Sequence, residues 1–198
     1  MEALVQIACS YNELHKYIDD NSYTKVSNHP STSPIEILQR IANDDRFDGI
    51  FQRKGDGNFK LLFEKHESLV LEYWNAWKIV DPVKQFQESQ EAAVSLLVST
   101  VPSNTHAYDF FLVHLLTTSH AVRILLPMVP ERFHINLVRQ WWLLTVGTYI
   151  GQLRPKIDDG LIGRPDLKGK HWRYVHEKAI NGPWATDAHY VKGRHIQY

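Results

Sequence analysis

Three histidines are spaced so that their imidazoles could share one side of a single helix. In the stretch from Pro102 to Pro130, a turn of about 100° per residue places these side chains within an arc of roughly 120°: His106, Phe110, Val113, His114, Thr117, His120 and Ala121. Imidazole takes and returns protons near neutral pH. A helix face that carries it beside Phe and Thr is therefore predicted to line a pocket for a weakly acidic aromatic substrate.

Each of these features also has a plain packing interpretation. Histidine is often partly buried without any catalytic role. Core packing explains tryptophans at helical spacing better than a ligand shelf does: Trp74, Trp77, Trp141 and Trp142. Arg154, directly before Pro155, is better suited to holding a helix end than a substrate. The motif DAHYVK, with Asp187, His189 and Lys192, is either an exposed C-terminal helix or part of a site.

Motifs for metals, flavins and nucleotides are missing from the sequence. Glu131 and His134 form one Glu-x-x-His pair, whereas a di-iron helical site uses two. The chain contains no His-Glu-x-x-His, no Gly-x-Gly-x-x-Gly after a strand and no Gly-x-Ser-x-Gly. We therefore expect no metal ligands and no flavin, and a di-metal oxidase stays open only as an alternative.

The elements that must position these residues are helices. Apolar residues recur at helical spacing, strand-like alternation is missing, and the joints between the long helices are short. The segments with this pattern are 2–18, 34–43, 59–80, 83–100, the histidine helix, 131–149, 171–180 and a last short helix from Thr186 or Asp187. Ser33 and Asp81, each followed by proline, are expected helix caps, and Asn104 is the expected cap of the histidine helix.

We predict an all-α fold: one domain over 1–198, built as an antiparallel helical bundle with long loops. Residues 150–170, with two Arg-Pro pairs and four glycines, are expected to form a lid or ordered loop.

Composition narrows the possible partners and the compartment. Lys plus Arg number 22 and Asp plus Glu number 22, so the balanced charge favours neither nucleic acid nor a membrane surface as a partner. The single cysteine, Cys9, excludes an internal disulfide framework. We see no leader and no run approaching the 18 or so apolar residues of a membrane span. These observations predict a cytoplasmic protein, and they leave its oligomeric state open.

Three motifs resemble those of a known family. The runs HAYDFFLVHLLTTSHAVRILLP, VRQWWLLTVGTYIGQLRP and TDAHYVKGRH, in this order, are similar to the C-terminal half of the questin oxidase-like family of fungal secondary metabolism. The resemblance covers most of residues 64–198. It implies an oxidoreductase that opens the central ring of an anthraquinone such as questin by a Baeyer–Villiger-like oxygenation.

The resemblance also implies cofactors, partners and site residues. NADPH is associated with the family's reaction, while neither flavin nor metal is needed; the partners are a small aromatic polyketide and molecular oxygen. By position, His114 and His120 are the candidates for base and orienting group, followed by His106 and Asp109. The residues that we assign to substrate binding are Phe110, Thr117, Trp141, Arg154, Asp187, His189 and Lys192.

The chain is shorter than the members that it resembles. We therefore expect an incomplete version of a larger helical fold, corresponding to the C-terminal part of a questin oxidase-like domain. The main alternative to an enzyme is a truncated, catalytically silent helical interaction protein. That alternative predicts exposed apolar surface on the leading helices, where further helices would pack.

Overall fold

The computed structural model describes residues 11, 14–101, 108–161 and 168–187. It confirms the all-α class, because helices account for the regular structure of these residues and the β-structure among them is one isolated bridge between Ser31 and Trp77. The main helices are α2 (Pro34–Ala42), α3 (Gly57–Lys65), α4 (Glu67–Ala76), α5 (Pro82–Val98), α6 (Phe110–Leu125), α7 (His134–Gly151) and α8 (Trp172–Asn181). Short 3-10 turns lie between them at η1 (Asn21–Tyr23), η2 (Asp45–Phe47), η3 (Leu126–Met128), η4 (Glu131–Phe133) and η5 (Asp159–Leu161).

Two helix starts follow the predicted capping chemistry. The Ser33 side chain accepts a hydrogen bond from the Glu36 backbone N–H, and Asp81 accepts one from the Lys84 N–H. In both helices proline takes the first position, where a missing N–H leaves no hydrogen bond unmade. The capping predictions for α2 and α5 are therefore confirmed.

The prediction of a single helix over 59–80 is wrong in one respect, because the chain forms two helices there. His66 leaves helical geometry, with φ −131° and ψ 24°, and it separates α3 from α4. The break lets the two halves pack on α7 in different ways: Phe59 of α3 lies against Gly147, while the Trp74 indole of α4 donates to the Arg139 carbonyl. Helical spacing continues through His66, so the sequence pattern does not reveal the break.

The histidine helix starts later than predicted. Tyr108 and Asp109 are not helical, and α6 begins at Phe110 with Asp109 as its cap. The predicted cap, Asn104, lies outside the described residues. Phe110–Met128 is also long and apolar enough to cross a membrane by length and composition alone, which corrects the expectation that no such run exists. This stretch packs against α5 and α7, and core helices of globular proteins share that composition.

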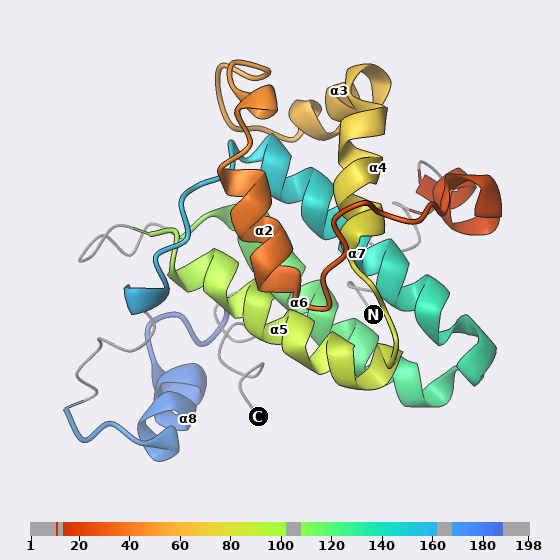
Figure 1. Cartoon of the computed structure of the whole chain (residues 1–198). Coiled ribbons are helices and arrows are strands. Elements are labelled where there is room, and N and C mark those ends of the chain that lie inside the picture. The colour runs from red at the N-terminus through yellow and green to blue at the C-terminus, as the bar shows by residue number, and fades with distance from the viewer. Residues whose placement is uncertain (1–10, 12–13, 102–107, 162–167, 188–198) are drawn as a thin grey trace.

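The core lies where α4, α5, α6 and α7 meet, with α2 packed on α5 and α4 (Figure 1). All four tryptophans named above are in it, as core packing predicts. Trp77 and Trp142 have ring centroids 5.1 Å apart, and Trp141 meets Phe86 edge to face at 5.3 Å. α8 lies at the periphery in Figure 1, and of its residues Ala179 is buried.

The remaining predicted segments are described in part. Residues 14–19 are helical, as expected for the end of the first helix, and the earlier part of that helix lies outside the described residues. In the expected loop at 150–170, η5 is a single turn and 162–167 are not described. The predicted C-terminal helix also lies outside the described residues, apart from turns up to Asp187.

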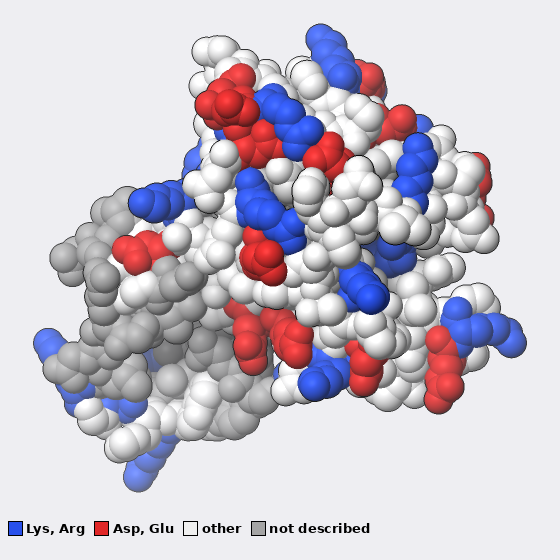
Figure 2. Space-filling view, viewed as in Figure 1, with Lys and Arg blue, Asp and Glu red and all other residues white. Residues whose placement is uncertain are grey.

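A cluster of charges fixes the turn after α2. Arg46 donates to Asp44 and to Glu72 of α4, and the Tyr73 hydroxyl donates to the same Asp44 carboxylate at 2.6 Å. The Arg46 hydrogen bond lowers the pKa of Asp44 to about 2, with a further contribution from Tyr73. In Figure 2 basic and acidic side chains lie intermixed on the face shown, as these pairs require.

Candidate functional site

Asp109 sets the start of the candidate site. Its Oδ1 accepts from the backbone N–H groups of Phe111 and Leu112, at 3.0 and 3.3 Å. Its Oδ2 accepts from Lys54 Nζ at 3.1 Å, which ties α6 to the loop before α3. A carboxylate at this end also matches the positive end of the helix dipole. Asp109, predicted as catalytic, therefore has a complete structural role at the helix start.

The stripe of α6 that carries the histidines is partly exposed. Phe110 is exposed, and His114, Thr117 and His120 are half-buried. The opposite side, with Leu112, Leu115, Leu116 and Val122, is buried in the core. The structure thus keeps the predicted division of this helix into an apolar side and a His and Thr side, while His106 lies outside the described residues.

His114 is held in a defined orientation by its own helix. Its Nδ1 lies 2.7 Å from the Phe110 carbonyl oxygen, and the Phe110 ring meets the imidazole edge to face at 4.4 Å. Because a carbonyl oxygen can only accept, Nδ1 carries the proton. In the neutral ring the lone pair is then on Nε2, so Nε2 is the atom of His114 that can act as a base.

His120 has the opposite arrangement. Its Nδ1 lies 2.9 Å from Nη2 of Arg123, one turn further along the helix. A guanidinium can only donate, so Nδ1 accepts and the neutral ring carries its proton on Nε2. His120 is therefore suited to donate a hydrogen bond through Nε2.

The two histidines offer complementary groups on one helix face. They lie six positions apart, or about 9 Å along the axis, so they would address different edges of one ligand. Thr117 lies between them, with its hydroxyl donating to the His114 carbonyl at 3.1 Å. One end of the stripe can accept a proton from a bound hydroxyl group, and the other can hold a developing oxyanion.

Two other predicted site residues have packing or supporting positions. Trp141 is 2% exposed, and its indole N–H donates to the Leu115 carbonyl. Arg154 Nη1 donates to the carbonyls of Ile41 and Asp44, at 3.1 and 2.7 Å, just at and beyond the end of α2. Arg154 thus holds a helix end, as its alternative interpretation predicted, and that end belongs to α2.

The C-terminal motif is only partly visible. Asp187 is exposed and its backbone N–H donates to the Trp184 carbonyl. His189 and Lys192 lie outside the described residues. The predicted convergence of this motif with the α6 stripe therefore stays a prediction.

Comparison with known proteins now places the chain. The sequence model of one family, described as questin oxidase-like, matches residues 1–194. The chain belongs to the questin oxidase-like family. The match begins at residue 1 and so extends well beyond the part, residues 64–198, that carried the resemblance. No curated protein and no solved structure matches the chain.

The described part of this questin oxidase-like chain bears on the cofactors considered above. It holds no group of three or more His, Cys, Asp and Glu side chains that could bind a metal ion. His134, of the Glu-x-x-His pair, is buried, and its Nε2 lies 2.8 Å from the Val129 carbonyl. Within the described residues this pair belongs to no such group of three, so the di-metal alternative has no ligand set there.

Three helix starts of the described residues are already occupied by carboxylate caps, which bears on where NADPH could bind. A dinucleotide diphosphate is commonly bound by backbone N–H groups at a helix N-terminus. At α3, α5 and α6 those groups are taken by the side chains of Asp56, Asp81 and Asp109, and their negative charge opposes a diphosphate. These three starts offer no place for it.

Sequence reasoning missed two residues that shape the stripe. Arg123 stands three positions after His120, a spacing that brings side chains together on a helix and could have revealed the pair. Lys54 is 55 residues from Asp109 in the chain, and no local pattern connects them. Only the packing of the loop before α3 near the start of α6 reveals this contact.

Proposed function

We propose that this chain is an oxidoreductase that cleaves the central ring of an anthraquinone-type substrate with molecular oxygen, in a Baeyer–Villiger-like reaction. Membership of the questin oxidase-like family supports the general class. The observation that carries the proposal is the tautomer of His114. Its Nδ1–H donates to the Phe110 carbonyl, so the lone pair of the neutral ring is on Nε2. That nitrogen is a fixed base on a half-buried face beside an aromatic ring.

In this reaction the protein has two tasks, which are to deprotonate the substrate and to orient it. Nε2 of His114 takes the proton of a hydroxyl group on a substrate that enters already reduced, as a hydroquinone. The resulting anion is electron-rich and transfers electrons to oxygen, and Nε2–H of His120 donates to the oxygen that gains negative charge. The reduced ring and O₂ together contain the atoms of the ring-opened acid, so this step needs no other oxidant or reductant.

The silent interaction protein is the alternative to weigh. It predicts exposed apolar surface on the leading helices. In the described part of the first helix, Leu14 is 1% exposed and Tyr17 is 2% exposed, whereas Tyr11 is 41% exposed. The preference for the enzyme therefore rests on family membership.

The test is oxygen uptake and product mass with chemically reduced questin or emodin and the purified, metal-assayed protein. We expect uptake above the protein-free rate and a ring-opened product heavier than the reduced substrate by two oxygen atoms, with label from ¹⁸O₂. Simple re-oxidation to the starting anthraquinone, at the protein-free rate and with folded protein, would contradict the proposal.

A further inference from the structure

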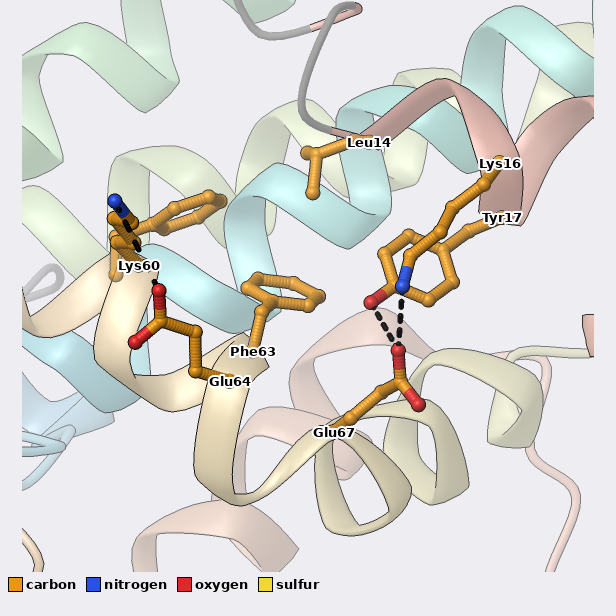
Figure 3. A pocket seen from close by; sticks show the side chains of 8 residues that line it. Leu14, Lys16, Tyr17, Lys60, Phe63, Glu64 and Glu67 are labelled. Carbon is orange, nitrogen blue, oxygen red and sulfur yellow. Dashed lines mark hydrogen bonds and ion pairs between the residues drawn. The ribbon is translucent and has the colours of Figure 1, made fainter.

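A cavity lies between residues 14–19, α3 and the start of α4, and no residue of the α6 stripe lines it. Its volume is about 510 Å³, within the range of pockets that hold small organic ligands. Four apolar or aromatic side chains form its inner wall: Leu14, Tyr17, Phe59 and Phe63. Figure 3 shows Phe63 in the middle of this cavity, with Tyr17 on one side and the Lys60–Glu64 pair on the other.

The aromatic wall is rigidly supported from behind. Phe63 lies 5.5 Å from the Tyr17 ring and 5.0 Å from Phe59, both in tilted contacts. Behind them, Gly147 of α7 has no side chain, and a Cβ there would lie 2.6 Å from the Phe59 ring and 3.0 Å from Phe63. The rings are therefore seated on the α7 backbone, and they present a fixed surface for a flat aromatic molecule.

Polar groups converge at one end of the cavity. The Tyr17 hydroxyl and Lys16 Nζ both donate to Oε1 of Glu67 (Figure 3), the latter at 2.9 Å. Burial, followed by the hydrogen bond to Glu67, raises the pKa of Tyr17 to about 12, and the Tyr17 hydrogen bond lowers the pKa of Glu67. At neutral pH the tyrosine is thus neutral and the glutamate is a carboxylate. A carboxylate has about four acceptor sites, so Glu67 can accept a further hydrogen bond.

The charges around the cavity select a neutral ligand. Lys16 and Lys60 are balanced by Glu64 and Glu67, so the lining carries no net charge. The rim therefore offers a charged ligand no net attraction to offset the cost of its desolvation, whereas a neutral ring with one hydroxyl pays little of that cost. The apolar wall matches the ring, and the Glu67 carboxylate matches the hydroxyl hydrogen.

We propose that this cavity is a binding site for a neutral, planar aromatic molecule with a hydroxyl group, whose ring lies on Phe59 and Phe63 and whose hydroxyl donates to Glu67. The site is separate from the α6 stripe and requires no turnover. If this cavity bound no ligand, the proposed oxygenation would be unaffected. If the oxygenation did not occur, this cavity could still bind its ligand.

The test compares two probes on the full chain by isothermal titration calorimetry at neutral pH. 2-Naphthol has the hydroxyl hydrogen, and 2-methoxynaphthalene has the same rings without it. Since a hydrogen bond to a charged acceptor is stronger than a neutral one, we expect 2-naphthol to bind roughly tenfold more tightly. Equal affinities, or no binding of either probe, would overturn the proposal.

Variants locate the hydrogen bond. Glu67→Gln should bring the affinity ratio of the two probes close to one, while the matched control Glu64→Gln, on the same rim without the Tyr17 contact, should keep the wild-type ratio. If E67Q does not fold, Lys16→Met tests the same hydrogen bond. Lys16 is half exposed and donates to Oε1 of Glu67, so without it 2-naphthol should bind even more tightly relative to 2-methoxynaphthalene. An unchanged ratio in E67Q or K16M would contradict the site.

Discussion

Asp44 is the most deeply buried carboxylate among the ion pairs of the described residues, with its side chain 8% exposed. Because its folded pKa of about 2 lies below the usual aspartate value of 3.8, it adds stability above pH 4 that is lost as the pH falls through about 2. We expect Asp44→Asn to lower the free energy of unfolding by about 2 kcal/mol at pH 7. Urea unfolding between pH 7 and pH 3 measures this, and the difference from wild type should narrow at the acid end.

The control for this residue is its neighbour Asp45, which is exposed and has no ion pair among the described contacts. Asp45→Asn should change stability much less. Equal losses in D44N and D45N, or a D44N difference that does not depend on pH, would show that the Arg46 and Tyr73 contacts do not stabilise the ionised Asp44.

At the scale of elements, local chemistry predicts helix starts better than helix breaks. Ser33-Pro34 and Asp81-Pro82 cap α2 and α5 because a cap needs only residues within one turn. The break at His66 and the late start of α6 depend on contacts with α7 and with Lys54, which lie far away in the sequence. The same distinction explains which functional features could be predicted. The contact between His114 and Phe110 is local in the sequence, whereas the Glu67 cavity joins residues about 50 positions apart and could not be predicted.

Close packing of α3 on α7 depends on one glycine. Gly147→Ala would place a Cβ 2.6 Å from Phe59, so α3 or the Phe59 ring must move. Against the gain in helix propensity, we expect a net loss of about 1–2 kcal/mol in the free energy of unfolding, measured by urea unfolding. Gly151→Ala is the matched control on the same helix, since its nearest contact would be 3.5 Å. Stability that is unchanged in G147A would contradict this packing.

At the scale of the whole molecule, two helices that carry different sets of chemistry-bearing side chains pack on α7. α6 packs on it with the His114 and His120 stripe, and α3 packs on it with the aromatic wall of the Glu67 cavity. The buried tryptophans around α7 make this a fixed frame. A change in one set should therefore leave the other in place, which allows the oxygenation and the aromatic binding site to be tested separately.

The most direct test of the proposed function is oxygen uptake by His114→Asn with a reduced anthraquinone as substrate. The asparagine amide can still donate to the Phe110 carbonyl, as Nδ1 does, so the variant keeps this hydrogen bond while it loses the basic Nε2 and the ring contact with Phe110. We predict a rate at least about 100-fold lower, in the range of general-base effects, and a wild-type rate in the control His29→Asn, whose exposed histidine lies in a distant loop. A folded H114N that consumes oxygen and opens the ring as fast as wild type would contradict the account.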